Sequence, residues 1–312
     1  MNILFLGSSE FSLPFLKTLG GSRHRVSAVV TTPSKPQGRG LKIQPNPAQL
    51  FAEEQGLPCF APGHLKDPDL LESLKKRAPD VLVVASYGKI LPPNWIQLPS
   101  RFAINVHPSL LPKYRGAAPI NWQIIRGETR TGVTIFKIEA GLDSGDVIAQ
   151  KECPLGREDN AATLSQKLAN EGAPLLMKVL ETIDAKSIRL VPQNGEEATY
   201  APKLKKGDGL IRWNQAAEDI RNLVRGLIPW PAAHVVFQGE PLKVLEAEAE
   251  PVACAEAEPG VILEINKTGF IRVQTGQGAL LVERVRPAGK REMTAFEFSI
   301  GRRLSPGIFL GG

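Results

Sequence analysis

Residues 81–85, with the sequence VLVVA, form an unbroken apolar run, and this run constrains the fold more than any other feature of the chain. A strand buried on both faces has such a composition, which is typical of parallel sheets covered by helices. Similar short runs alternate with segments of helical pattern in the first half of the chain. The expected strands are 3–6, 25–31, 81–85, 102–106 and 132–138, the last exposed or at an edge, and the expected helices are 11–19, 46–55, 118–125 and 163–184, the last interrupted near 172–174. This alternation predicts an α/β fold with a doubly wound, Rossmann-like parallel sheet.

The C-terminal third of the chain has a different pattern. Residues 260–285 resemble a string of short strands with glycine-bearing turns at 266–269 and 275–278, and one helical segment, 216–227, precedes them. A small β-barrel of the oligonucleotide-binding (OB) type is the natural expectation for such a segment. Residues 185–202 are polar and lack periodicity. We therefore predict an N-terminal catalytic domain at 1–186, a linker at 187–204 and a C-terminal OB-like domain at 205–312.

The composition limits the location and the partners of the protein. The 312 residues carry a net charge of +6, which is compatible with a polyanionic partner. No apolar run reaches the roughly 18 residues that a membrane span needs, and no basic leader with a long apolar stretch stands at the N-terminus. Cys59, Cys153 and Cys254 are widely spaced and form no CxxC pair. We therefore expect a cytoplasmic monomer without membrane contact, disulfide or metal.

The first turn between a strand and a helix is Gly7-Ser8-Ser9-Glu10-Phe11. It does not fit the GxGxxG pattern, and GxxxxGK[ST] is absent from the chain. A dinucleotide cofactor is therefore disfavoured, although backbone N–H groups at such a turn can still hold a ligand.

A polar pair marks the end of the strand expected at 102–106. Asn105 and His107 lie two residues apart, so their side chains point to one face of the strand. This carboxyl end is the edge at which open α/β sheets bind ligands. Histidine exchanges protons near neutral pH, and an asparagine amide can donate a hydrogen bond to a developing oxyanion. The pair favours acyl transfer over phosphoryl transfer, with a histidine that is merely satisfied at a strand end as the alternative.

Residues 141–146, with the sequence GLDSGD, follow the strand expected at 132–138. The flanking glycines put Asp143 on a tight loop, from which its carboxylate can orient a histidine and stabilise the protonated ring. Aspartate and glycine also favour turns in general, so a turn-forming role for Asp143 stays open. For Asp146 the turn-forming role is the expected one.

Two longer motifs carry a family resemblance. Residues 105–122 (NVHPSLLPKYRGAAPINW) and 132–148 (GVTIFKIEAGLDSGDVI) resemble the two signatures of the folate-dependent formyltransferases in order and spacing. Segments similar to the branch of this family that formylates methionyl-tRNA are 32–58, 83–92, 229–244 and 259–280. The resemblance covers nearly the whole chain. It implies transfer of the formyl group of 10-formyltetrahydrofolate to the amino group of methionyl-initiator tRNA, which gives N-formylmethionyl-tRNA for translation initiation.

The resemblance also implies roles for individual residues. Asn105, His107 and Asp143 match the catalytic trio of the family. Folate binding, largely through backbone groups, is implied for Ala85, Ser86, Tyr87, Gly88, Ile90, Leu91, Ser109, Leu110, Leu111 and Pro112. The chain departs from the family at Pro108, where some members carry glycine, and at Ser86, where many carry alanine. Proline has no N–H, so any ligand bond from that amide is lost.

Residues 31–47 combine prolines and glycines with positive charge, and they overlap residues 32–58, which resemble the tRNA-contacting loop of the family. The spacing of the prolines and glycines rules out a long helix or a central strand. Lys35, Arg39 and Lys42 stand on this segment without a compensating acid. We predict an irregular, mobile loop that grips the tRNA acceptor end, with a merely solvated loop as the alternative. Further contacts to the tRNA backbone are expected from Lys203, Lys205 and Lys206.

Two alternative functions stay open. One is a formyltransferase or formyltetrahydrofolate hydrolase that acts on a small molecule, which needs neither the basic loop at 31–47 nor a C-terminal barrel. The other is a non-catalytic tRNA-binding module, which the presence of Asn105, His107 and Asp143 opposes. Nucleophilic catalysis by Ser109 is not expected, because no second histidine lies nearby in the sequence.

Overall fold

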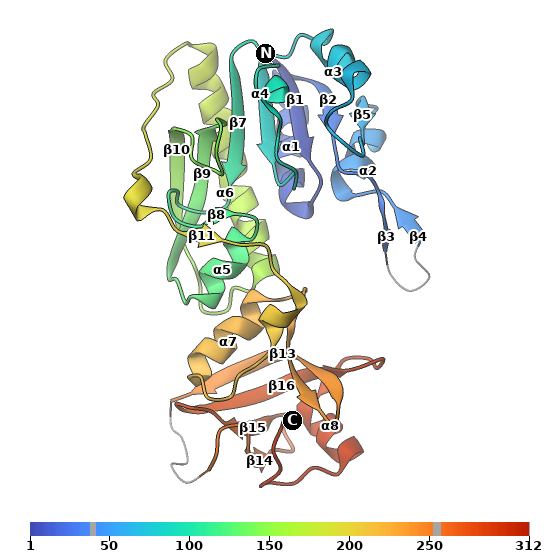
Figure 1. The fold of residues 1–312 in the computed structure, drawn as a ribbon, viewed down its shortest axis with the longest axis vertical. Helices are drawn as coiled ribbons and strands as arrows, with labels where there is room; N and C mark the ends of the chain where they lie inside the picture. Colours follow the sequence, from blue (N-terminus) through green and yellow to red (C-terminus); the bar gives the residue numbers. More distant parts are fainter. Residues whose placement is uncertain (38–41, 252–256, 312) are drawn as a thin grey trace. The chain divides into compact units, whose positions relative to one another are not determined.

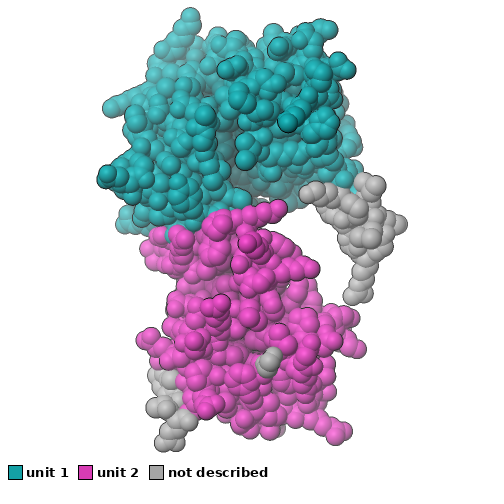
Figure 2. Space-filling model, viewed as in Figure 1, with its two compact units in different colours: residues 1–119, 130–154, 165–201 teal, residues 120–129, 155–164, 202–312 magenta. Residues whose placement is uncertain are grey.

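The computed structural model describes residues 1–37, 42–251 and 257–311, which form two compact units (Figure 2). Unit 1 contains residues 1–119, 130–154 and 165–201, and unit 2 contains residues 120–129, 155–164 and 202–312. Each unit therefore gathers segments that are separated in the sequence. The predicted boundaries of the two domains and of the linker stay predictions.

Unit 1 is built on a seven-stranded sheet with the strand order β10-β9-β7-β6-β1-β2-β5 (Figure 1). Its parallel strands are β1 (Asn2–Gly7), β2 (Arg25–Val30), β5 (Cys59–Phe60), β6 (Val81–Ala85) and β7 (Phe102–His107). Two antiparallel strands, β9 (Arg130–Lys137) and β10 (Val147–Pro154), complete it. Every residue of β6 is buried, as its apolar run predicts. The predicted α/β fold class is confirmed.

The strand β9 corrects one sequence prediction. It lies between β7 and β10, so it is an interior strand and not an edge strand. Its residues 131–136 are buried, and their polar members are satisfied inside the sheet: the Thr134 hydroxyl donates a hydrogen bond of 2.6 Å to the carbonyl oxygen of Ser109. The outer strand β10 was not predicted, because most of its residues are at least partly exposed and it lacks an apolar run.

Among the helices of this part of the chain, those after Asn46 and Asp67 begin at a side-chain cap. The helices are η1 (Glu10–Ser12), α1 (Leu13–Gly20), α2 (Pro47–Glu54), α3 (Pro68–Lys75), α4 (Pro93–Ile96), α5 (Pro119–Ile125) and α6 (Ala161–Asp184). The Asn46 side chain accepts a hydrogen bond from the Gln49 N–H, and Asp67 caps α3 in the same way. The break predicted in the last helix is wrong, because α6 continues through Pro174. Packing outweighs local propensity there: a Cβ on Gly172 would come within 2.9 Å of the Phe15 ring.

The basic segment at 31–47 contains two short strands, β3 (Lys35–Gln37) and β4 (Lys42–Gln44). They pair in antiparallel register, with Lys35 opposite Gln44. The expectation of a wholly irregular loop is therefore wrong, since a two-stranded ribbon needs no long strand and tolerates a proline. Arg39 lies outside the described residues.

Unit 2 contains an antiparallel six-stranded sheet in the order β12-β13-β16-β15-β14, with β17 paired to β16. The strands are β12 (Ala233–Phe237), β13 (Glu240–Glu250), β14 (Ile262–Ile265), β15 (Ile271–Gln274), β16 (Ala279–Pro287) and β17 (Met293–Thr294). Two helices, α7 (Ala217–Gly226) and α8 (Ala295–Arg302), pack on its core, which includes Trp213, Val244 and Phe298. A small β domain next to an α/β unit is thus confirmed.

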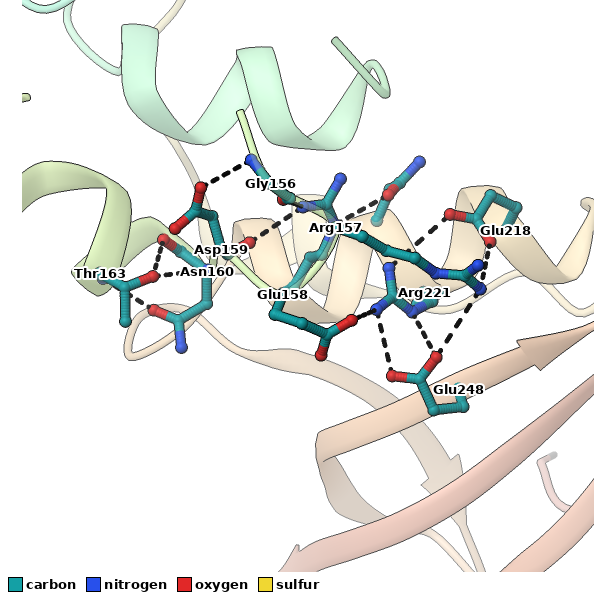
Figure 3. Close-up of polar contacts among 11 residues, drawn as sticks. Gly156, Arg157, Glu158, Asp159, Asn160, Thr163, Glu218, Arg221 and Glu248 are labelled. Carbon is teal, nitrogen blue, oxygen red and sulfur yellow. Dashed lines mark hydrogen bonds and ion pairs between the residues drawn. The ribbon is translucent and has the colours of Figure 1, made fainter. Parts of the chain in front are cut away.

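Residues 156–160 belong to unit 2, where charged side chains hold them (Figure 3). We define the Arg221 cluster as Arg157, Glu158, Glu218, Arg221 and Glu248. Only 3% of the Arg221 side chain is exposed, and it donates hydrogen bonds to Glu248 at 2.9 and 3.1 Å and to Glu158 at 3.1 Å. Burial opposes this charge, yet the hydrogen bond and charge of Glu248 and the nearby carboxylates raise the pKa of Arg221 above its usual value.

Residues 185–201, most of the predicted linker, are tied to unit 1. Val191 forms a bridge with Val147 at the start of β10, and β11 (Tyr200–Ala201) pairs in parallel with β8 (Arg115–Gly116). The short helix η2 (Gly195–Glu197) lies between these two contacts. After the segment, η3 (Lys206–Gly209) opens the C-terminal part of unit 2. Within the described ranges, no helix has the length and apolar character of a membrane span.

Candidate active site

Three side chains predicted from the sequence meet at the carboxyl edge of the unit 1 sheet. Asn105 and His107 stand at the end of β7, and Asp143 lies on the loop between β9 and β10. His107 is buried, with Nδ1 at 3.7 Å from Asp143 Oδ2 and Nε2 at 2.9 Å from the carbonyl oxygen of Tyr114. Both ring nitrogens face acceptors, so only the protonated imidazole can donate to both. The ring is therefore held between the Asp143 carboxylate and the Tyr114 carbonyl.

Asn105 presents its carboxamide to a cavity. Its neighbours in the sheet are Val84 on β6 and Phe136 on β9, so Asn105 lies between two other strands near the end of β7. The carboxamide has no hydrogen-bond partner among the residues that the structure describes. An amide that faces a cavity without a protein partner can donate to an oxygen atom of a ligand.

The loop of Asp143 has an unusual backbone. Asp143 adopts a left-handed conformation with φ 48°, and Gly141 has φ 118°. A Cβ on Gly145 would overlap the carbonyl oxygen of Lys137, so this position requires glycine. The Gly116 N–H donates a hydrogen bond of 2.8 Å to Asp143 Oδ2. The carboxylate is thus aimed at His107 by its own backbone and by a second loop.

Sequence reasoning missed two residues that support this loop. Gln193 donates hydrogen bonds from Nε2 to the carbonyl oxygens of Asp143 at 3.0 Å and of Gly145 at 2.7 Å. Its Oε1 accepts from the buried Arg115, at 3.1 Å from Nε and 2.7 Å from Nη2. Gln193 lies 50 residues from Asp143 in a polar segment without periodicity, so the sequence pattern contained no signal for this contact.

The cavity at this edge has a volume of about 630 Å³. It is lined by Val84, Lys89, Ile90, Leu91, Pro93, Ile96, Gln97, Asn105, Phe136, Ile138, Glu139, Ala140, Gly141, Leu142 and Asp143. The walls are mostly apolar, and the polar groups are few. Ile90 and Leu142 are both exposed, 89% and 53%, and so present apolar surface at the cavity. Such a site fits a flat organic ligand held by a few polar contacts.

The predicted folate residues divide into two groups. Ile90 and Leu91 line this cavity, and Ala85–Gly88 lead into it from the end of β6. Ser86 has φ 53°, and its hydroxyl accepts a hydrogen bond of 2.8 Å from Ser9. Tyr87 is buried, which raises the pKa of its hydroxyl to about 12. It points its ring into the core between β6 and the helices rather than into the cavity.

The turn of Ser109, Leu110, Leu111 and Pro112 does not line the cavity. Its polar groups are bonded within unit 1: the Leu111 N–H donates to Thr134, and the Leu111 carbonyl accepts from Gln150. The Ser109 hydroxyl donates to the Lys113 carbonyl at 2.7 Å, an arrangement unlike that of a nucleophile with its base. A folate contact of this turn stays a prediction.

The predicted tRNA residues lie in two places. Lys35 and Lys42 stand on β3 and β4 of unit 1, whereas Lys203, Lys205 and Lys206 are exposed on unit 2, at and just before η3. Over the described parts of the chain, no cluster of three or more His, Cys, Asp or Glu side chains is arranged to hold a metal ion.

Comparisons with known proteins extend over the whole chain. Residues 1–180 match the family described as formyl transferase, and residues 203–303 match its C-terminal domain. Methionyl-tRNA formyltransferase of Desulforamulus reducens is 39% identical over 311 residues, which cover 100% of this chain and 98% of that protein. The protein of the same name from Thermodesulfovibrio yellowstonii is 43% identical over 306 residues, which cover 98% and 97%. A solved N-formyltransferase from Helicobacter canadensis, in complex with folinic acid and dTDP-3-aminofucose, shares the fold with a TM-score of 0.68 at 16% identity over 90% of this chain and 98% of that one.

Proposed function

Because this chain belongs to the formyl transferase family, we propose that it transfers the formyl group of 10-formyltetrahydrofolate to the amino group of methionyl-initiator tRNA. The observation that carries the proposal is the meeting of Asn105, His107 and Asp143 beside an apolar cavity, in a chain similar over its full length to methionyl-tRNA formyltransferases. The product, N-formylmethionyl-tRNA, serves translation initiation.

The reaction begins with attack of the methionine amine on the formyl carbon. A C–N bond forms, and the formyl oxygen becomes an oxyanion. Asn105 lines the cavity, and its amide has no partner within the described ranges of the chain, so we assign it a hydrogen bond to this oxygen. Such a preorganised donor is typically worth about 3–4 kcal/mol in the transition state.

The His107–Asp143 pair is assigned two tasks, stabilisation of the oxyanion and transfer of the amine proton. The ring of His107 stabilises the developing negative charge, and Asp143, at 3.7 Å from its Nδ1, orients the ring. Asp143 also lines the cavity, so we assign to its carboxylate the acceptance of the proton that leaves the attacking amine. As the bond from the formyl carbon to the folate nitrogen breaks, that nitrogen receives the proton that the methionine amine has lost. The products are the formylated amine and tetrahydrofolate with an N–H group, so the step balances.

The cavity suits the formyl donor. Its volume of about 630 Å³ lies within the usual range of small-molecule sites, and its walls are apolar apart from Lys89, Gln97, Glu139, Asn105 and Asp143. We assign the pterin end of the folate to this cavity. The backbone of 85–91 and, by the family resemblance, of 109–112 is proposed to add the polar contacts.

The tRNA contacts are proposed from charge. The lysines of β3 and β4, together with Arg39, Lys203, Lys205 and Lys206, are the cations that we assign to the tRNA backbone and acceptor end. We propose that the protein acts as a cytoplasmic monomer. Its domains are proposed to be a catalytic domain at 1–186 and a tRNA-binding OB-like domain at 205–312, joined by 187–204.

One assay tests the function. Purified protein is incubated with 10-formyltetrahydrofolate and methionylated tRNA, and formylation of initiator tRNA is compared with that of an elongator tRNA. We expect formylation of the initiator and little of the elongator. Asp143→Ala is expected to be severely impaired, and Asp146→Ala, on the same loop, only mildly. Formylation of small amines with no use of either tRNA would contradict the proposal.

A further inference from the structure

We propose that Gln193 is a positioning residue for formyl transfer, which acts by holding the backbone of the Asp143 loop in its left-handed conformation. The inference rests on the proposed function, because it assigns Asp143 a role in the reaction. It concerns a segment, residues 191–201, that follows α6 and that the sequence pattern marks only as a polar linker.

The contacts of Gln193 use most of the bonding capacity of its amide. Both N–H groups donate to carbonyl oxygens of the loop, those of Asp143 at 3.0 Å and Gly145 at 2.7 Å. The amide oxygen accepts two bonds from Arg115. One of these carbonyls belongs to Asp143 itself and the other lies two residues after it, so a shift of the bonded main chain moves the base of the Asp143 side chain.

The 191–201 segment joins two loops of the site. Through Val191 it is bonded to Val147 after the Asp143 loop, with N–O distances of 2.8 and 2.9 Å. Through Thr199 it is bonded to the loop after β7: the Thr199 hydroxyl accepts from Tyr114 N–H at 2.9 Å, and its carbonyl accepts from Arg115 N–H at 2.8 Å. Tyr114 supplies the carbonyl that faces His107 Nε2. The segment therefore sets the position of the acceptors on both sides of the His107 ring.

The left-handed backbone of Asp143 needs such support. A non-glycine residue in this region is strained and persists only where the surrounding structure holds it. The bonds from Gln193 fix the carbonyl group of the strained residue itself and that of Gly145, and so stabilise the loop in this conformation. A neutral amide does this without adding a charge beside the carboxylate.

The test compares Gln193→Met with a matched control, Asn194→Ala. Methionine preserves volume and removes all four hydrogen bonds. Asn194 stands next in the same segment, but its side chain is exposed and bonds only to Glu196 and Glu197. In the full-length protein we expect Gln193→Met to lower kcat by roughly 10- to 100-fold, as a misplaced catalytic group does, with similar KM values for both substrates. Asn194→Ala should leave kcat unchanged.

A double-mutant cycle separates positioning from general damage. In an Asp143→Ala background, Gln193→Met should cost little further kcat, because the group it positions is already absent. Amide hydrogen exchange supplies a readout that needs no activity. The Gly116 N–H, bonded to Asp143 Oδ2, should exchange faster in Gln193→Met than in the wild type and the Asn194→Ala variant.

Two results would overturn the inference: unchanged exchange at Gly116 in Gln193→Met, or an equal loss of kcat in the wild-type and Asp143→Ala backgrounds. Thermal unfolding of each variant identifies any that is misfolded, and the exchange measurement on the folded variant then decides. If the wild type formylates no tRNA, the proposed function fails, while the exchange result still supports or overturns the positioning by Gln193.

Discussion

The Asp143 loop and the segment Gly156–Asn160 are both irregular, and each is held by side chains from distant parts of the chain. The Asp143 loop is held by neutral donors, the Gln193 amide and the Gly116 N–H. Gly156–Asn160 is held by cations of α7, since Arg225 donates to the carbonyl oxygens of Gly156 and Asp159, and Arg221 pairs with Glu158 (Figure 3). Neutral hydrogen-bond donors thus hold one irregular segment, and guanidinium groups hold the other.

The difference follows from what each segment carries. A charge placed 4 Å from another is worth about 4 kcal/mol at an effective dielectric constant near 20, so a cation bonded to the Asp143 loop would alter the charge balance of the site. Gln193 accepts from Arg115 with its carbonyl oxygen and donates to the loop with its N–H groups. The Gln193 side chain therefore lies between the Arg115 guanidinium and the carbonyl groups of the loop. Gly156–Asn160 carries no proposed catalytic group, and direct charge contacts there affect stability alone.

The largest effect should come from the His107–Asp143 pair. His107→Asn removes the imidazole that faces Asp143 while retaining a small polar side chain. We expect formyl transfer to fall roughly 100- to 10,000-fold, the usual cost of a lost acid–base group, with little change in thermal unfolding. Turnover of methionyl-tRNA under saturating substrates measures this. Near-normal turnover would remove His107 from the mechanism and leave Asn105 and Asp143 as the functional pair.

In the Arg221 cluster, the expected effect is on stability alone. Glu248→Ala removes the strongest partner of a buried guanidinium and leaves that charge less compensated, which should cost about 1–3 kcal/mol of unfolding free energy. Arg221→Met should cost less, because it removes the buried charge itself and leaves carboxylates that are 39–82% exposed. Denaturant unfolding ranks the two variants, and formylation per folded molecule is the control. The reverse ranking would show that the carboxylates lose more stability without the guanidinium than the guanidinium loses without Glu248.

The sequence predicted the elements whose pattern is local. The buried run of β6 and the two-residue spacing of Asn105 and His107 specify a sheet and one face of a strand end, and both are present. It failed at β9 and β10 because strand order depends on pairing partners, which a hydrophobic pattern does not name. It failed at the predicted break in α6 because Gly172 is required by the Phe15 ring, a contact between distant residues.

The site was predictable to the same extent. Asp143 stood out because glycines flank it, and the structure places it opposite His107. Gln193 and Arg115 did not stand out, because a lone glutamine in a polar segment has no local signature. The exposed apolar residues Ile90 and Leu142 were likewise not predictable as a pair, because only the folded structure shows that their two loops line one cavity.

The next effect concerns a charged residue that belongs neither to the contacts of the Asp143 loop nor to the Arg221 cluster. Arg39, in the basic segment, should contribute to tRNA binding alone. Arg39→Ala is expected to weaken use of tRNA by about 1–3 kcal/mol, the cost of one charge-assisted contact, and to leave folate binding unchanged. Fewer counterions should then be released, so the salt dependence of tRNA binding should become shallower. KM for tRNA at several salt concentrations checks both. A loss of folate affinity with unchanged tRNA kinetics would instead assign the segment to the folate site.

The smallest effect should come from Glu283, which lines the same cavity of unit 2 as Arg221 and Glu248. Burial, followed by the charges of Glu248 and Glu246, raises the pKa of Glu283 above its ordinary 4.5. An acid whose pKa is raised by folding binds its proton more tightly in the folded state, so its ionisation costs stability. That cost is absent below about pH 4.5 and is complete once the pH exceeds the folded pKa.

Glu283→Gln should therefore raise the melting temperature at pH 7 by about 1–3 °C, and the gain should disappear as the pH falls toward 4.5. Glu240→Gln is the matched control, because Glu240 is exposed on the same sheet and should show no such pH-dependent gain. Scanning calorimetry at the two pH values measures the difference. A loss of stability at pH 7 would mean that Glu283 serves as a further partner of Arg221. The stability of the Arg221 cluster would then be limited by a shortage of carboxylates rather than by repulsion between them.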